Sequence, residues 1–177
     1  DAEGLLHALE THAWDEESGY YGFVLHDQAW APTGLLRNHQ GLNLNCGFDG
    51  IYPLVAGGGK APHQERLLSH LKREDELLTP YGLTAVSQSA PYFSLQGYWN
   101  GGVWYPHAWY FGRALLDCGE GEFLHELVTR QLNQWCGQAR DRWNSYEMLR
   151  LASGEGAWHA SFSGLTSPLL NWAHSLY

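Results

Sequence analysis

Two segments of the chain concentrate residues whose types and spacing could do chemistry. The first is GYWNGGVWY, in which two glycines lie between Trp99 and Trp104 and Asn100 adds a hydrogen-bonding side chain. Glycines permit a close backbone approach, and indole rings offer flat apolar faces that suit the C–H face of a sugar ring. The segment therefore predicts one wall of a sugar subsite. The alternative is a tight loop–helix junction filled by aromatic side chains.

The second segment is SYEMLRLASGEGAWHASFSGLT, which carries Glu147, Glu155 and Trp158. Glycoside hydrolysis needs one carboxylic acid to protonate the leaving oxygen and one carboxylate to activate water or attack carbon. From the residues alone, either glutamate could be one of these two groups, and a solvated surface position is the alternative for each. Trp158 would add another sugar-facing wall.

Histidines in the aromatic segments are candidates for contacts with sugar hydroxyl groups. His107 follows the first segment and His159 lies within the second. A plain structural role is the alternative for both. Metal binding is not expected, because the chain has no HExxH motif and pairs such as His7 and His12 do not suit one helix face.

Other catalytic chemistries lack their motifs. The run VAGGGKA resembles a phosphate loop, but Leu54 stands where that motif needs glycine and Ala61 where it needs Ser or Thr. No GxSxG nucleophile elbow is present. The sequence therefore implies neither a metal ion nor an organic cofactor.

Composition narrows the class of protein further. With 44% hydrophobic and 16% charged residues among 177, the chain is expected to fold around a core. A net charge of −9 argues against nucleic-acid binding, which needs a basic surface. No apolar run approaches the ~20 residues that span a bilayer. Three cysteines without a CxxC pair indicate neither a disulfide framework nor a zinc ribbon.

Apolar periodicity predicts an all-α chain whose helices alternate with long loops. The longest loops, rich in glycine and aromatic residues, are Trp14–Asn45, with a short hairpin in DEESGYYGFVLHD, Thr79–Gly102 and Ser145–Thr166. Loops of this length in a compact domain are usually functional. The expected helices are Leu5–Ala13, Ile51–Ala56, one whose first turn holds Pro62, Trp104–Leu116, one after the acidic GEGE run, and one opened by Pro168.

About six helices of this kind match half of a twelve-helix toroid whose site is built from inter-helix loops. We therefore expect part, about half, of an (α/α)₆ toroid. The alternative is a smaller helical domain with long loops.

The motifs, in their order along the chain, resemble glycoside hydrolase family 63, a clan of processing α-glucosidases that shares its fold with trehalases. YWNGGVW resembles the family's YWRGxxW signature, AWDEESGYYG its Trp-Asp-Glu-x-x-Gly-Phe/Tyr stretch, and LTPYGLTAVS its Thr-Pro-Tyr-Gly-Leu loop. After Glu147 come Ser153-Gly154, Phe162 and a closing helix at the family's spacing. The chain departs from the family at Asn100, Gly102, Met148-Leu149 and Gly164.

This resemblance implies that residues 1–177 are the C-terminal half of an (α/α)₆ catalytic domain, with Glu147 in the position of the general base. Trp99, Trp104 and Trp158 would be sugar-facing walls, and Asn100 and His107 contacts to hydroxyl groups. The implied activity is an inverting, exo-acting hydrolysis of α-glucosides or oligosaccharides without a cofactor. Asp15 and Asp27 lie in the wrong segment to be the acid.

The general acid is therefore expected from a second chain or an N-terminal segment that completes the barrel. Two alternatives remain open: a noncatalytic carbohydrate-binding or scaffold half-domain, and an (α/α)₆ sugar epimerase or isomerase.

Overall fold

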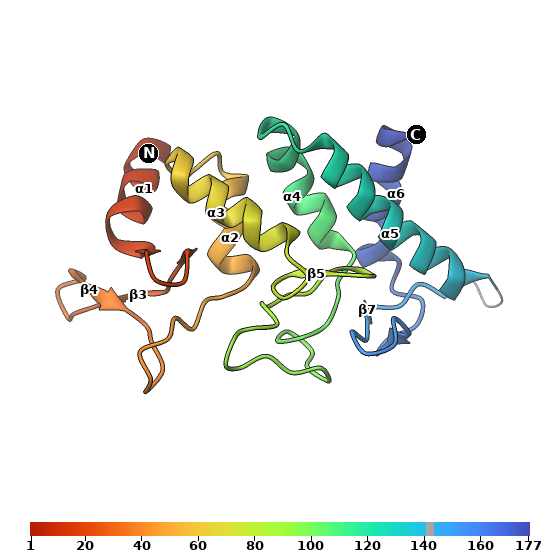
Figure 1. The fold of residues 1–177 in the computed structure, drawn as a ribbon, viewed down its shortest axis with the longest axis horizontal. Helices are drawn as coiled ribbons and strands as arrows, with labels where there is room; N and C mark the ends of the chain where they lie inside the picture. Colours follow the sequence, from red (N-terminus) through yellow and green to blue (C-terminus); the bar gives the residue numbers. More distant parts are fainter. Residues whose placement is uncertain (141–143) are drawn as a thin grey trace.

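The computed structural model describes residues 1–140 and 144–177 as a helix-rich chain. Its helices lie roughly side by side, and most of the long connecting loops lie at one end of them (Figure 1). A short π-helix, η1 (Leu9–Ala13), continues the first α-helix. The α-helices of the described part are α1 (Ala2–Ala8), α2 (Phe48–Val55), α3 (Ala61–Lys72), α4 (Pro106–Asp117), α5 (Gly121–Ala139) and α6 (Ser163–Leu176).

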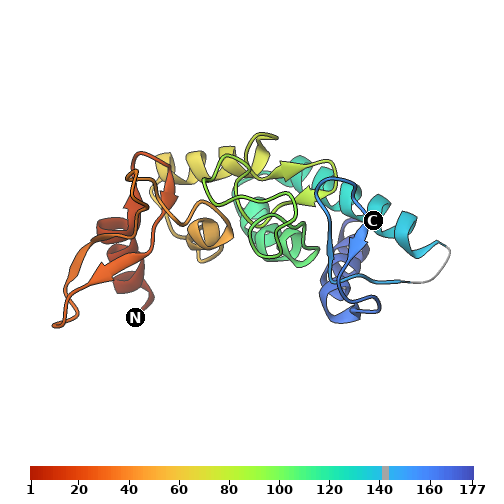
Figure 2. The same cartoon turned by 90° about the horizontal axis from the view of Figure 1, so that it is seen from below.

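The helices form two layers that bend into a shallow arc. α4 packs against α2 on one side and α6 on the other, while α5 lies against α4 and α6 and α3 lies against α2. Seen from below, α2, α4 and α6 follow the inner side of the arc and α3 and α5 the outer side (Figure 2). The N-terminal and C-terminal parts of the chain consequently lie at opposite ends of the molecule.

Apolar side chains at helical spacing explain why these segments fold and pack as they do. On α5, Leu124, Leu127 and Val128 are fully buried, and Glu122 lies in the first turn, where the helix dipole favours a negative charge. On α4, Gly112 allows a close approach to α6. A Cβ atom added at Gly112 would lie 2.4 Å from the ring of Trp172.

The long loops contain four short antiparallel strand pairs that the sequence predicted only in part. The expected hairpin in residues 14–45 is present, and a second one follows it directly. The other two pairs lie in segments for which we expected only loops. The pairs are β1 (Trp14–Asp15) with β2 (Tyr20–Tyr21), β3 (Val24–His26) with β4 (Pro32–Leu35), β5 (Leu78–Thr79) with β6 (Gly82–Leu83), and β7 (Met148–Leu149) with β8 (Gly156–Ala157).

The first two helices begin three residues before their expected starts, and the start of the last helix differs most. Pro168 does not open the last helix, because α6 begins at Ser163 and Pro168 is inside it. Proline lacks the backbone N–H that would bond the carbonyl four residues earlier, so it disfavours this position. The turn before it forms nevertheless, since Thr166 and Leu169 are buried against the rest of the chain.

Two further expectations concern the cysteines and the membrane. Cys46, Cys118 and Cys136 are all free thiols. Within the part of the chain that the structure describes, no helix has both the length and the apolar character needed to cross a bilayer.

Candidate active site

Glu147 lies at the entry to β7, where backbone pairing fixes its position. Its N–H donates to the carbonyl of His159 over 3.0 Å. Two residues further on, Leu149 exchanges backbone hydrogen bonds of 2.8 and 3.1 Å with Val103, which lies in the YWNGGVW segment. The two segments singled out in the sequence are therefore joined by main-chain bonds.

The carboxylate of Glu147 is buried, with 7% of the residue exposed, and has one direct partner. The hydroxyl of Tyr98 donates a hydrogen bond to its Oε1. That bond raises the pKa of Tyr98, because ionising the phenol would place two negative charges side by side. Among the described residues, no side chain or backbone group bonds the second oxygen, Oε2, which is left for solvent or ligand.

Tyr98 also organises the aromatic side chains around the carboxylate. Its ring meets those of Trp99, Trp104 and Trp158 edge-on, at centroid distances of 5.2, 4.8 and 5.1 Å. Trp99 stacks flat on Trp104, with centroids 4.2 Å apart and planes within 3°. Trp99 and Trp158 are each 63% exposed. These two exposed rings therefore lie against Tyr98, the residue that bonds Glu147.

Trp104 differs from its expected place as a sugar-facing wall. It is only 2% exposed, and its indole N–H donates to the carbonyl of Tyr98 over 3.2 Å. Its large apolar ring is buried at the start of α4, where it supports Trp99 from beneath. Trp158 is held in an unusual way, with a left-handed backbone (φ 64°) that a non-glycine residue rarely adopts.

Asn100 shapes the loop of the first segment. Its amide donates to the carbonyl of Tyr92 over 2.8 Å, and its own backbone carbonyl accepts from the N–H of Ser94 over 2.9 Å. A Cβ atom at Gly101 would lie 1.7 Å from the Ser94 carbonyl oxygen, so the loop closes only with glycine there. The structure thus places Asn100 as a link within the loop.

His107 is buried in the first turn of α4. Its Nδ1 bonds the carbonyl of Trp104 over 3.1 Å, and its ring centroid lies 3.6 Å from that of Phe48. Burial lowers the pKa of His107 to about 3, so the ring is neutral near pH 7. His159, by contrast, is exposed and contributes its carbonyl to the Glu147 backbone.

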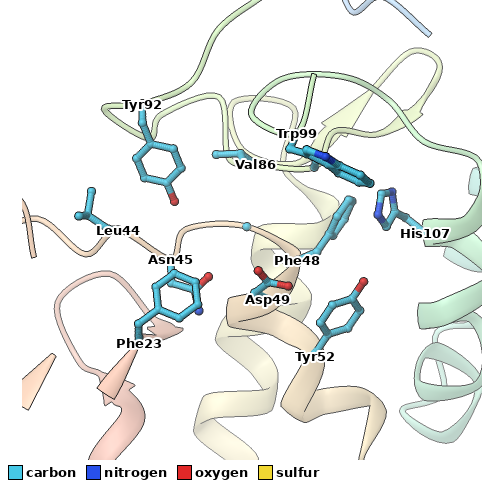
Figure 3. A pocket seen from close by; sticks show the side chains of 12 residues that line it. Phe23, Leu44, Asn45, Phe48, Asp49, Tyr52, Val86, Tyr92, Trp99 and His107 are labelled. Atoms are coloured by element: carbon cyan, nitrogen blue, oxygen red, sulfur yellow. The ribbon is translucent and has the colours of Figure 1, made fainter. Parts of the chain in front are cut away.

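An open cavity of about 250 Å³ lies between α2 and α4, and His107 borders it. Figure 3 shows Trp99 and His107 on one side of this α2–α4 cavity, Phe23 and Tyr92 on the other, and Asp49 and Tyr52 on α2 between them. Trp99 is therefore shared between the cavity and the aromatic cluster around Glu147.

Other carboxylates near the predicted segments have different surroundings. Glu155 is exposed in the turn between β7 and β8, where its side chain accepts from Ser153. Asp27 accepts two backbone N–H bonds in the β3–β4 turn. Among the described Asp and Glu residues, only Asp15, Glu76 and Glu147 are buried.

Asp15 and Glu76 belong to hydrogen-bonded clusters within the fold. Burial acts to raise the pKa of Asp15, but bonds from Ser18 and Arg37 outweigh it and hold that pKa below its ordinary value. A carboxyl group with a lowered pKa is a poor general acid near pH 7. Glu76 accepts from the hydroxyls of Tyr20 and Ser87 inside the core.

Comparison with known proteins identifies the class of fold. The chain superposes on the GH63 mannosylglycerate hydrolase of Thermus thermophilus, in complex with Tris, with a TM-score of 0.69 and 24% identity, over 97% of this chain and 36% of that one. Neutral trehalase of Saccharomyces cerevisiae gives a TM-score of 0.70 at 15% identity, over 97% and 29% of the two chains. The chain therefore has the fold of a part of these glycosidases.

The sequence matches give the family itself. Residues 1–163 match the family described as mannosylglycerate hydrolase MGH1-like glycoside hydrolase domain. A Schizosaccharomyces pombe protein described as "Probable mannosyl-oligosaccharide glucosidase" is 24% identical over 94% of this chain and 21% of its own length. The chain belongs to the MGH1-like, glycoside hydrolase family 63-like group. It spans about a fifth of that curated relative and about a third of the T. thermophilus hydrolase.

Sequence reasoning missed Tyr98, which makes the one side-chain bond to Glu147 found among the described residues. Its signal was available, because Tyr98 is the first residue of the YWNGGVW motif. The sequence pattern by itself marks only the two indoles and Asn100 of that motif as sugar ligands. A phenol next to them is the natural donor for a carboxylate brought in from elsewhere in the chain.

Proposed function

We propose that residues 1–177 form the C-terminal half of an (α/α)₆ catalytic domain, in an inverting, exo-acting glycoside hydrolase that acts on α-glucosides. Glu147 would be the general base of this enzyme. The observation that carries the proposal is the buried carboxylate of Glu147, bonded by Tyr98, whose ring contacts the exposed rings of Trp99 and Trp158, in a chain of a glycoside hydrolase family.

The half-barrel is supported by the layering of the helices. The two layers alternate along the chain, with α2, α4 and α6 on the inner side of the arc (Figure 2). Large apolar side chains on α4 and α6, including Trp109, Tyr110 and Leu170, are exposed. A second half of the toroid would cover such surface and would also bring the general acid. The catalytically competent unit is then this chain together with that half.

The chemistry follows from the free oxygen of Glu147. Tyr98 occupies Oε1, so Oε2 is available to accept a proton from water. The resulting hydroxide oxygen would attack the anomeric carbon, while the acid of the other half protonates the departing glycosidic oxygen. Trp99 and Trp158 would hold the apolar face of the sugar, and Trp104 would keep Trp99 in place. Asn100 would act through the loop it closes and His107 through a neutral ring nitrogen.

The test is Glu147→Gln in the full-length protein, with Glu155→Gln as the matched control. Loss of a general base costs on the order of 10²–10⁴-fold, so we expect kcat to fall by at least 10²-fold in the first variant. The control should keep kcat within twofold, because Glu155 is exposed. Activity of Glu147→Gln near that of the parent protein would remove Glu147 from this role.

The substrate and the stereochemistry need separate measurements. The relatives carry the names of a mannosylglycerate hydrolase, a trehalase and a mannosyl-oligosaccharide glucosidase, so a panel of α-glucosides and of mannosylglycerate tests the choice of α-glucosides. NMR of the fresh product gives the anomer: an inverting enzyme releases β-glucose from an α-glucoside. Binding of the panel without turnover would instead support a noncatalytic carbohydrate-binding half-domain.

A further inference from the structure

The β7–β8 hairpin, which begins directly after Glu147, is held along both of its outer edges. On the β7 side, Leu149 pairs with the backbone of Val103. On the other side, no further strand of the described part of the chain pairs with β8. Two glutamines of α5, Gln134 and Gln138, bond this edge instead. They are four residues apart, so they lie on the same face of the helix.

Gln138 bonds the β8 segment through both ends of its amide. The N–H of Gly156 donates to its Oε1 over 3.2 Å, and its Nε2 donates to the carbonyl of Gly154 over 3.4 Å. The amide of Gln134 donates to the same carbonyl. In a parallel β-ladder, one residue likewise donates to a carbonyl and accepts from the N–H two positions further along its neighbour. The Gln138 amide therefore takes the place of a residue in a neighbouring strand.

The hairpin depends on such outside bonds because it is short and contains glycines. Each strand has two residues, and even a longer two-stranded hairpin is marginally stable when it stands alone in water. Gly154 and Gly156 have no side chains to pack, and the rings of Tyr81 and Tyr146 occupy the space that their Cβ atoms would need. Bonds from its backbone to α5 therefore locate β8 relative to the helices.

The backbone passes the position of β8 on to the carboxylate of Glu147. The residue after Glu147, Met148, pairs with Ala157 of β8. The N–H of Glu147 itself donates to the carbonyl of His159 over 3.0 Å. A shift of β8 would thus move Glu147 relative to the hydroxyl of Tyr98. Misplacing a catalytic group by about 1 Å can cost on the order of 10²-fold in rate.

We propose that Gln138, supported by Gln134, is a positioning residue of the hydrolase. Its amide fixes the β7–β8 hairpin so that the carboxylate of Glu147 meets water and the sugar in the reactive geometry. Both glutamines act through the backbone of the hairpin. The inference rests on the proposed function for the chemical role of Glu147, whereas the contact with the hairpin rests on the hydrogen bonds alone.

Steady-state kinetics of the full-length protein test the effect on catalysis. Gln138→Leu keeps a side chain of similar size but loses both bonds, so we expect kcat to fall about tenfold with KM within about twofold. Gln138→Glu keeps an acceptor for the N–H of Gly156 and should retain kcat within about threefold. The matched control, Asn133→Leu, removes an exposed amide from the same helix and should leave kcat unchanged.

The Glu147→Gln background separates positioning from a general loss of stability. Because Gln138 acts through that carboxylate, adding Gln138→Leu to Glu147→Gln should leave the residual kcat within about twofold. A merely structural role would lower kcat by the same factor in both backgrounds.

Hydrogen exchange followed by mass spectrometry tests the hairpin without any substrate. In Gln138→Leu, the amides of residues 154–159 should exchange on the order of tenfold faster than in the parent protein. Those of residues 124–128, in the buried stripe of α5, should keep their rates and show that the helix is intact.

Four outcomes would overturn the positioning role. They are a kcat of Gln138→Leu like that of the parent, an equal loss in both backgrounds, a Gln138→Glu protein as slow as Gln138→Leu, and unchanged exchange of residues 154–159. Parent-like turnover of Glu147→Gln would refute the general base, and the catalytic part of the inference would fall with it. The exchange rates would then still decide whether Gln138 holds the hairpin.

Discussion

Burial of His107 predicts a specific pH dependence of stability. A histidine in an unfolded chain has a pKa of about 6.5, whereas burial lowers the pKa of His107 to about 3 in the folded state. Between these values the unfolded state binds a proton that the folded state does not. The contribution of a neutral His107 to the free energy of unfolding is therefore complete above pH 6.5 and is lost as the pH falls toward 3.

The size of the effect follows from the two pKa values. At pH 5 the unfolded histidine is almost fully protonated and the folded one is neutral, which lowers the free energy of unfolding by about 2 kcal/mol. At pH 7 the same calculation gives about 0.2 kcal/mol. The parent protein should therefore lose about 2 kcal/mol through His107 alone between pH 7 and pH 5.

The substitution His107→Gln isolates the contribution of His107 to the pH dependence of the free energy of unfolding. Glutamine is neutral at every pH, and its amide can still donate to the Trp104 carbonyl that the imidazole bonds. Urea unfolding of the full-length protein at pH 7, 6 and 5 gives the free energy for parent and variant. The variant can be less stable at pH 7, but it should lose about 2 kcal/mol less than the parent on going to pH 5.

A control tests whether the burial of His107, and not the mere loss of a histidine, changes the pH dependence. His125 is exposed on α5, so His125→Gln should keep the pH dependence of the parent. The pKa of His70 is also lowered by burial, but His70 is present in all three proteins and cancels in the comparison. If His107→Gln and the parent lose stability in parallel from pH 7 to pH 5, the ring of His107 is not held neutral by burial.

Three further predictions test other parts of the structure. Tyr98→Phe removes the hydrogen bond to Glu147. Since such a bond to a charged group contributes about 1.5–3 kcal/mol, kcat/KM should fall on the order of 10- to 100-fold at a temperature where both proteins stay folded. An unchanged kcat/KM would mean that Tyr98 does not position the carboxylate. Gly112→Ala should lower the free energy of unfolding by about 1–3 kcal/mol, because the added methyl group meets Trp172. The control, Gly137→Ala, has open space around it and should raise the free energy of unfolding by up to about 1 kcal/mol. Equal effects of the two substitutions in calorimetry would contradict the close approach of α4 and α6. Asp15→Asn should cost about 1–3 kcal/mol at pH 7, since it removes the charged acceptor of Ser18 and of the partly exposed Arg37, and should make the protein less sensitive to acid as the pH falls below about 4. An acid unfolding curve like that of the parent would count against the lowered pKa of Asp15.

The helices could be predicted from the sequence because their apolar spacing is local information. Leu124, Leu127 and Val128 mark the buried stripe of α5, and the acidic run before them marks its start. Glycines 57–59 end α2 where expected, and α3 begins one residue before Pro62. Each of these signals acts within a few residues of the boundary it sets.

The elements that were missed depend on contacts between distant segments. α6 starts five residues before Pro168 because Thr166 and Leu169 are buried by other elements, which outweighs the local preference of proline. The two-residue strands β7 and β8 have little propensity of their own. β7 is held partly by the pairing of Leu149 with Val103, 46 positions away. No local sequence pattern predicts such a bond.

The same distinction decides which glutamate matters. From residue type and spacing alone, Glu147 and Glu155 were equivalent, and only the family resemblance favoured the first. In the structure, the buried carboxylate of Glu147 and the exposed one of Glu155 are only eight positions apart, because β7 and β8 pair as an antiparallel hairpin with Glu155 in the turn between them. The backbone β-bridge between Val103 and Leu149 places Glu147 where its carboxylate accepts the hydrogen bond from Tyr98. A pairing that shifted β7 by one residue would turn the alternate side chains to the other face of the hairpin. Glu147 would then leave Tyr98, so the register of this short hairpin decides which carboxylate can serve as the base.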